Sequence, residues 1–522
     1  MLYFELKKAD GLMIIYECFC TKEKKSDMYI NKKHEIQLKF VQLLYKYWLF
    51  FAAIILMAAY LKASGSMANK SGDAASIWET IKSFSNEKII PSYVLYKGFV
   101  SVYPYVWFYQ LSSLLNLNEF FFVKLFYCTL FAYISAVGFP YLIENLLNIK
   151  AKNWRKALLI IILFWLWHDN VAMTQLAVDL PSLACFLLLV NSALKIARQS
   201  KEHMYRRVIY TGILLGLNLC SSGQYTLSTI VVLLYILIKI VSYNITNKAK
   251  RFSSLVLVSI LLMGMTAVYT YNNHFDRTVV DPLRAEGAWI PPGKTWLEIG
   301  FTRLMGVQRV GVGLTLPDNR GIVILKDVYG EQFEETYKDI IDGKIGFSVL
   351  EYMQLALKYP VDFLSRYINR LFLALTPDGG SPNISRLFAS YTLIFCSFLS
   401  IYKRCKTVKQ FFSTEIILVL SFLCAIAAPI VLTIELRYAM QIQGFIYAVG
   451  LLDDQLWTGL KNIGRFCKGI VIKPRQFIQK LIEVPLSYTP ILYIVFVVFC
   501  FIHIATIYET VGSDTLNILF KF

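Results

Sequence analysis

Long apolar runs alternate with short polar segments along the chain. Several runs approach the roughly 20 residues that an α-helix needs to cross about 30 Å of hydrocarbon. The pattern predicts about eleven such helices, which in chain order cover residues 41–61, 122–147, 157–167, 180–194, 208–220, 225–238, 253–271, 387–402, 415–433, 438–452 and 490–508. With 56% hydrophobic and only 17% charged residues, the 522-residue chain is too apolar for a soluble protein of this size. We therefore expect an all-α polytopic membrane protein.

The formal net charge of +18 could indicate a nucleic-acid partner, so the positions of the basic residues have to be considered. The basic residues gather in the short connectors between apolar runs and in the N-terminal segment 1–40, as in Lys150, Lys152, Arg155 and Lys156, or in Lys403, Arg404, Lys406 and Lys409. Short basic connectors on alternate sides are typical of the positive-inside rule. Membrane orientation thus accounts for the charge, and no nucleic-acid partner is expected.

The same rule divides the chain into four parts. A basic cytoplasmic segment, 1–40, precedes a transmembrane core, 41–271, which includes a first external loop at 62–121. A large external loop follows at 272–386, and the C-terminal part, 387–522, contains a basic cytoplasmic connector at 453–486. Neither external loop contains a cysteine, so no external disulfide framework is expected. This composition favours a multi-pass protein of a bacterial plasma membrane, with a cytoplasmic N-terminus.

Two amphipathic segments, 74–84 and 103–115, are predicted in the first external loop, with their apolar faces toward lipid. Asp73 comes directly before the first and is predicted to be its N-cap, a role that stabilises a helix by about 0.5 to 2 kcal/mol. An ionised carboxylate at a membrane surface is also suited to general-base catalysis. Both roles stay open on the pattern alone.

The second external loop is predicted to fold over the site and to end in an amphipathic stretch, Tyr352 to Leu375, which Pro360 breaks. This stretch is expected to rest on the membrane. Gly311-Val312-Gly313 lacks the third glycine of a nucleotide-binding fingerprint and is interpreted as a turn.

A family resemblance rests on the order of several short stretches. These are Ser71-Gly72-Asp73-Ala74, Tyr103-Pro104-Tyr105-Val106-Trp107, Val178-Asp179-Leu180-Pro181, the glycines of Gly212-Ile213-Leu214-Leu215-Gly216 before Gly223-Gln224-Tyr225, and Glu435-Leu436-Arg437-Tyr438. Their order and sidedness resemble those of the GT-C glycosyltransferases, which use polyprenyl-phosphate sugars, and of the protein mannosyltransferase and aminoarabinose transferase branch in particular. The chain departs from that pattern where Ala74 replaces the acidic neighbour of the early Asp.

The resemblance implies a GT-C-like fold with interfacial helices in two external loops, and it implies roles for several residues. Asp73 would be the catalytic base. Lys97 and Arg437 would contact the leaving phosphate, although Lys97 is equally suited to snorkelling toward headgroups and Arg437 to pairing with Glu435. Asp179 would orient substrate, because acidic groups at membrane depth tend to face a polar cavity. His168 and Asp169 would line the same cavity or form only an interfacial pair.

The expected function is transfer of a sugar from a polyprenyl-phosphate carrier to a glycan, lipid or protein acceptor on the external face, with inversion at the anomeric carbon. The substrate-binding set is then Asp179, Lys97, Arg437, Glu435, His168 and Asp169. No cofactor and no metal are expected, because one carboxylate supplies too few oxygen ligands for a divalent ion. The alternatives are a polysaccharide polymerase and a lipid or polysaccharide transporter.

Overall fold

The structure is a computed structural model. It describes residues 47–65, 72–88, 99–198, 204–244, 248–280, 282, 309–310, 316–317, 327, 330–332, 349–375, 383–404, 415–431, 436–453 and 489–509. Contacts divide the chain into two units, Met1–Ala52 and Ala53–Phe522. The arrangement below concerns the second unit.

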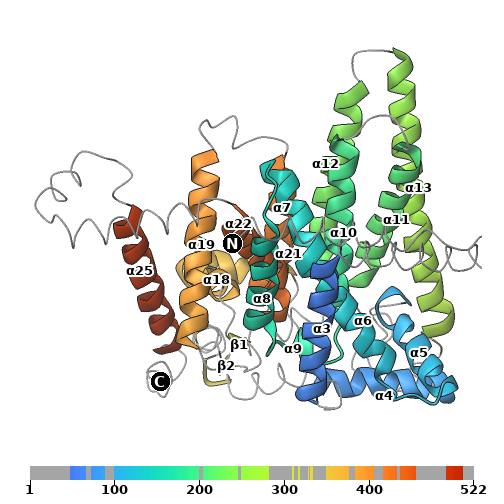
Figure 1. Ribbon diagram of the computed structural model, residues 1–522, viewed down its shortest axis with the longest axis horizontal. Coiled ribbons are helices and arrows are strands. Elements are labelled where there is room, and N and C mark those ends of the chain that lie inside the picture. Colours follow the sequence, from blue (N-terminus) through green and yellow to red (C-terminus); the bar gives the residue numbers. More distant parts are fainter. Residues whose placement is uncertain are drawn as a thin grey trace, which may run out of the picture. The chain divides into compact units, whose positions relative to one another are not determined.

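Helices make up nearly all of the described residues (Figure 1). The first half of the chain contains α3 (Trp48–Ala63), α4 (Gly72–Asn86), α5 (Phe99–Leu114), α6 (Phe121–Ala132), η2 (Tyr133–Gly138), α7 (Phe139–Leu147), α8 (Asn153–Trp167), α9 (Val171–Thr174), α10 (Asp179–Arg198), α11 (Met204–Ser221), η3 (Gly223–Tyr225), α12 (Thr226–Asn244), α13 (Lys248–Phe275) and η4 (Asp276–Val280). The second half contains η6 (Gly330–Gln332), α17 (Val349–Lys358), α18 (Pro360–Ala374), α19 (Ile384–Arg404), α21 (Glu415–Val431), η7 (Leu436–Ala439), α22 (Met440–Leu452) and α25 (Thr489–Glu509).

Two short strands, β1 (Arg309–Val310) and β2 (Leu316–Pro317), form an antiparallel pair. In this pair Arg309 lies opposite Pro317 and Val310 lies opposite Leu316. The Gly311-Val312-Gly313 stretch lies outside the described residues, and its interpretation as a turn stays a prediction.

Among the residues that the structure describes, five helical segments are long and apolar enough to cross a membrane. They are Phe121–Leu147, Asp179–Arg198, Gly223–Ser242, Ser253–Val279 and Ile384–Tyr402. Shorter apolar helical stretches lie at Trp48–Ala63, Ile416–Ala427 and Leu492–Ala505. Each range predicted from the apolar runs overlaps a described helix. The fold is thus a helical one with the apolar segments of a membrane protein.

Close helix packing in the core depends on glycine. α11 packs along α13, and a Cβ atom at Gly212 would lie 2.5 Å from the carbonyl oxygen of Leu261. One turn later, a Cβ at Gly216 would lie 2.6 Å from Cβ of Val268. Small residues four apart let two helix backbones approach without side chains between them. The Gly212 and Gly216 spacing therefore fixes how near α11 and α13 can lie.

A π-helical segment, η2, interrupts the predicted second span between α6 and α7. Widening of the helix leaves backbone carbonyls without their usual partners. The Nδ2 atom of Asn191 on α10 donates a hydrogen bond of 3.0 Å to the carbonyl oxygen of Gly138 at the end of η2. A buried polar side chain of one helix thus satisfies the irregular backbone of its neighbour.

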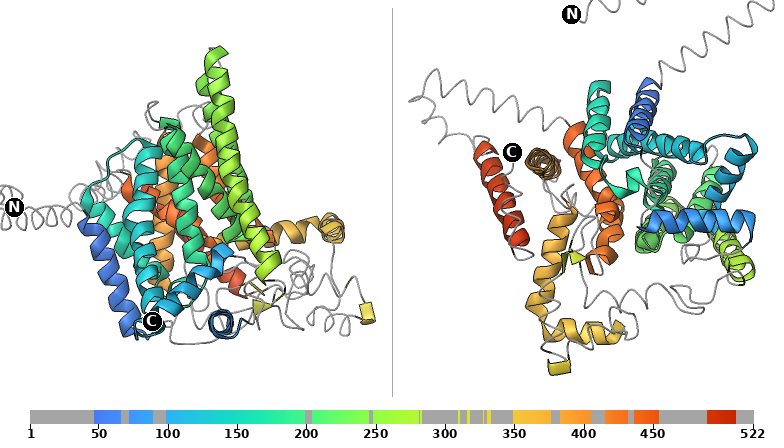
Figure 2. Two further views of the ribbon diagram at one scale, coloured as in Figure 1. Left: turned by 90° about the vertical axis from the view of Figure 1, so that its right-hand side faces the viewer. Right: turned by 90° about the horizontal axis from the view of Figure 1, so that it is seen from below.

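The helix α4 runs across the ends of its neighbours rather than along them (Figures 1 and 2). This course agrees with the prediction of two helices in the first external loop, which the structure places at α4 and α5. The prediction that the apolar face of α4 meets lipid is wrong. Ile77, Trp78, Ile81 and Phe84 are buried, and the Trp78 ring stacks on Phe120 at 4.4 Å. Since α4 packs on α5, protein covers the face that the pattern assigned to lipid.

The amphipathic stretch before α19 has the predicted break. α17 ends at Lys358 and α18 begins at Pro360. Along both helices an exposed apolar stripe runs at helical spacing and consists of Leu350, Met353, Leu357, Val361, Leu364, Ile368 and Leu371. The stripe is the face that the sequence assigned to the membrane surface.

Candidate functional site

Asp179 and Arg437 lie together although they are far apart in the sequence. Nε of Arg437 is 4.0 Å from Oδ2 of Asp179, and the side chains are only 15% and 6% exposed. Asp179 is the first residue of α10 and Arg437 lies in η7, the short 3-10 helix before α22. A carboxylate in the first turn of a helix also interacts favourably with the helix dipole. The buried carboxylate is therefore neutralised from two directions.

Tyrosine hydroxyls surround the chain just before Asp179. The hydroxyl groups of Tyr105 and Tyr127 lie 3.2 and 2.5 Å from the carbonyl oxygen of Ala177. The Ala177 amide donates to the Tyr127 hydroxyl at 2.8 Å. The Asp179 carboxylate also interacts electrostatically with Tyr105, Tyr127 and Tyr225. These contacts fix the backbone that presents Asp179.

Burial is the main cause that raises the pKa of Tyr105 well above its ordinary value, and the neighbouring Tyr127 and the Asp179 carboxylate raise it further. The hydroxyl of Tyr105 is thus a neutral hydrogen-bond donor at physiological pH. A neutral phenol beside an acidic side chain is suited to binding hydroxyl-rich ligands rather than to taking up a proton.

Two glutamines hold the backbone beside Arg437. Nε2 of Gln224, in η3, donates to the carbonyl oxygen of Tyr438 at 2.6 Å, and Nε2 of Gln441 donates to the same atom at 2.5 Å. The Arg437 guanidinium carbon lies 5.0 Å from the Tyr438 ring centroid. Its Nη2 atom is 3.1 Å from the Tyr438 hydroxyl. Arg437 is thus positioned by its own neighbour as well as by Asp179.

A second polar group lies after the end of α8. Nε2 of His168 is 3.0 Å from Oδ1 of Asp169, and Nη2 of Arg386, on α19, is 2.7 Å from Oδ2 of Asp169. The same Nη2 lies 3.1 Å from Nε2 of His168, and the hydroxyl of Tyr60 donates to the carbonyl oxygen of His168 at 2.8 Å. His168 and Asp169 do form the predicted pair, and Arg386 and Tyr60 extend it to α19 and α3.

The remaining predicted residues have different outcomes. α4 begins at Gly72, so Asp73 lies in its first turn, and the prediction that Asp73 precedes the helix as an N-cap is wrong by this shift. The side chain of Asp73 lies outside the described residues, as do Lys97 and Glu435 entirely. The prediction that Arg437 pairs with Glu435 is therefore untested, whereas its contact with Asp179 is present.

Several site residues were not singled out in the sequence. Tyr105 and Tyr127 lie in aromatic-rich stretches where nothing distinguishes them from packing residues. Arg386 carried a usable signal, because a basic residue at the predicted outer end of a span departs from the positive-inside rule. Its burial and its bonds to His168 and Asp169 explain why it is there.

No group of three or more His, Cys, Asp or Glu side chains suited to a metal ion occurs within the described ranges. These ranges do contain the carboxylate of Asp179, the guanidinium group of Arg437, phenol hydroxyls and two carboxamides around the start of α10. This set suits the binding of a polar or anionic group. Comparison with protein-family models and with curated proteins finds no match for this chain.

Proposed function

We propose that the protein is an integral membrane glycosyltransferase that takes a sugar from a polyprenyl-phosphate carrier and transfers it, with inversion, to a glycan, lipid or protein acceptor on the external face. The observation that carries the proposal is the buried contact between Asp179 and Arg437 beside the Tyr105 and Tyr127 hydroxyls. An arginine that an acid holds in place is a ready contact for phosphate. Phenol oxygens and carboxamide groups supply hydrogen-bonding partners for sugar hydroxyls.

A chain of contacts supports placing Asp73 in the same site. α4, which contains Asp73 in its first turn, packs on α5. Tyr105 of α5 donates to the carbonyl oxygen of Ala177, two residues before Asp179. The helix of the proposed base and the helix of the proposed substrate contact are thus joined through one intermediate helix.

The proposed architecture has about eleven transmembrane helices in a GT-C-like arrangement. Its support is that every apolar run predicted as a span carries a helix. On this arrangement the Asp179–Arg437 contact and the start of α4 lie on the external side.

In the proposed reaction, Asp73 accepts the proton of an acceptor hydroxyl. The acceptor oxygen attacks the anomeric carbon on the face opposite the phosphate, and the bond between that carbon and the phosphate oxygen breaks. The polyprenyl phosphate leaves with the electron pair. Arg437 and Lys97 stabilise the charge that develops on it, because cationic contacts strengthen in a partly dehydrated site. Asp179 orients Arg437 and the sugar, with His168, Asp169 and Glu435 as outer contacts.

The test uses purified full-length protein, radiolabelled polyprenyl-phosphate sugars and an acceptor extract from the membrane. The wild type should form an acceptor-linked product, and Asp73→Asn should lower the rate by about 100-fold or more, the usual loss of a general base. Glu79→Gln, which removes an exposed carboxylate from the same helix, is the matched control and should keep the rate. Full activity of Asp73→Asn would remove the catalytic role, and flux across vesicles without a covalent product would indicate a transporter.

A further inference from the structure

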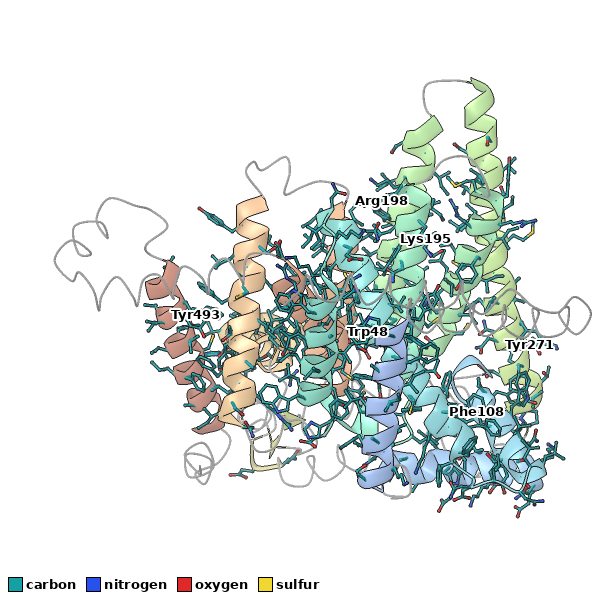
Figure 3. The ribbon with its side chains drawn as sticks, in the orientation of Figure 1. Trp48, Phe108, Lys195, Arg198, Tyr271 and Tyr493 are labelled. Carbon is teal, nitrogen blue, oxygen red and sulfur yellow. The ribbon has the colours of Figure 1, made fainter. Side chains whose placement is uncertain are left out.

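Another charged cluster lies at the end of α10 opposite to Asp179, and it consists of residues that the proposed reaction does not use: Lys195, Arg198, Arg207 and Tyr141. Lys195 and Arg198 lie in the last turn of α10, Arg207 lies in the first turn of α11, and Tyr141 lies on α7. Figure 3 labels Lys195 and Arg198 near each other at that end of α10. We name these four residues the Tyr141 cluster.

The three basic groups converge on one ring. Nζ of Lys195 lies 5.1 Å from the Tyr141 ring centroid. The guanidinium groups of Arg198 and Arg207 interact electrostatically with the Tyr141 hydroxyl. Cations that gather around one ring repel each other unless an anion lies between them or water screens them. The cluster thus concentrates positive charge from two helices around a single point.

Neighbouring groups hold this cluster without neutralising it. Nη1 of Arg198 lies 3.4 Å from Oδ1 of Asn145, and its Nη2 donates to the Asn145 carbonyl oxygen. Glu144, the carboxylate one turn beyond Tyr141, already accepts from Lys156 at 2.8 Å and from the Ala151 amide at 2.9 Å. The ion pairs among the described residues include none with Lys195, Arg198 or Arg207.

Arg207 has the most demanding position. Its Nη1 atom is buried and has no hydrogen-bond partner in the part of the chain that the structure describes. A buried, charged donor without a partner is costly. An anion beside Nη1 would remove that cost.

The position of the cluster favours a lipid as the source of the anion. It lies at the ends of Phe121–Leu147 and Asp179–Arg198, two segments that are long and apolar enough to cross a membrane. Tyr141 is six residues from Leu147, about 9 Å along the helix axis, so the cluster lies within two turns of the end of an apolar segment. Tyr210 lies three residues after Arg207 on the same face of α11 and is exposed. It offers an apolar surface for the adjoining acyl chain.

We propose that the Tyr141 cluster binds the phosphate of an anionic phospholipid headgroup, with Arg207 and Lys195 as its principal contacts. Arg198 is oriented toward the same phosphate by Asn145. The site is separate from the proposed glycosyltransferase site and does not depend on it.

The test measures retention of phosphatidylglycerol by delipidated full-length protein with native mass spectrometry, and the rise in melting temperature on adding that lipid. Arg207→Gln should weaken binding by about fivefold, the effect expected for one basic group at a membrane surface. Arg206→Gln is the matched control, because Arg206 is the adjacent residue with the same charge and is exposed. It should bind the lipid as the wild type does.

Three outcomes would overturn the proposal. They are equal losses in Arg206→Gln and Arg207→Gln, equal retention of zwitterionic phosphatidylcholine, and displacement of the lipid by millimolar inorganic phosphate, which would indicate a soluble anion. Lys195→Gln supplies a second variant if Arg207→Gln does not fold, since the Lys195 side chain is exposed and its removal leaves no buried gap.

Discussion

Arg437 in η7 lies 4.0 Å from Asp179 at the start of α10, and both side chains are largely removed from solvent. The contact joins two helices that are separated by about half of the chain. Because both charges are largely removed from solvent, each lowers the cost of burying the other. The energetic coupling between Asp179 and Arg437 can be measured from the stabilities of the single and double variants.

The first prediction concerns this pair. Asp179→Asn and Arg437→Gln should each lower the free energy of unfolding by about 3 to 5 kcal/mol, the cost of leaving one buried charge without its partner. The double variant should lose clearly less than the sum, since it leaves no unpaired charge. Thermal unfolding of the detergent-purified variants measures all three. Additive losses would show that the two side chains do not interact.

The second prediction contrasts the two ion-pair partners beside His168. The Asp169 side chain is 61% exposed, whereas that of Arg386 is 11% exposed. Asp169→Asn should therefore cost no more than about 1 kcal/mol of stability, as for a surface ion pair. Arg386→Gln should cost about 1.5 to 3 kcal/mol, because it removes charged hydrogen bonds made by a largely buried side chain. Comparison of the two melting curves tests this, and equal losses would contradict it.

The helices could be predicted from the sequence because an apolar run in a membrane has few structural choices. Backbone groups in hydrocarbon must bond within the segment, so a run of apolar residues becomes a helix whatever its neighbours are. The same holds for α17 and α18, where Pro360 removes a donor and starts a new helix. These outcomes depend on local chemistry alone.

The apolar face of α4 could not be assigned in the same way. Periodicity identifies which residues share a face, but lipid and protein are equally good partners for Ile77, Trp78 and Ile81. In the structure this face packs against protein, because aromatic residues of α5 and Phe120 lie beside it. The Asp179–Arg437 contact was likewise beyond the pattern, since it depends on which helix ends meet.

The third prediction concerns the irregular segment η2. Asn191→Leu removes the 3.0 Å donor to the Gly138 carbonyl oxygen. Stability should fall by about 0.6 kcal/mol and by no more than about 1.7, the range measured for side-chain hydrogen bonds between membrane helices. Thr129→Val is the control, because the Thr129 hydroxyl is exposed and bonds only within its own helix. If Thr129→Val lost as much stability as Asn191→Leu or more, the hydrogen bond to η2 would contribute nothing specific.

The fourth prediction concerns the close approach of α11 and α13. In Gly212→Ala the new Cβ would lie 2.5 Å from the Leu261 carbonyl oxygen, a backbone atom that cannot rotate away. Overpacking of this kind costs about 1 to 3 kcal/mol. Alanine in place of glycine stabilises a helix interior by about 1 kcal/mol. The cost exceeds this gain when the two helices must separate to make room for the new methyl group. Gly223→Ala is the matched control, since nothing lies within 4 Å of its Cβ position. Thermal unfolding should therefore show a lower melting temperature for Gly212→Ala than for the wild type, and no decrease for Gly223→Ala. Equal melting temperatures of the two variants would mean that α11 and α13 can separate without cost.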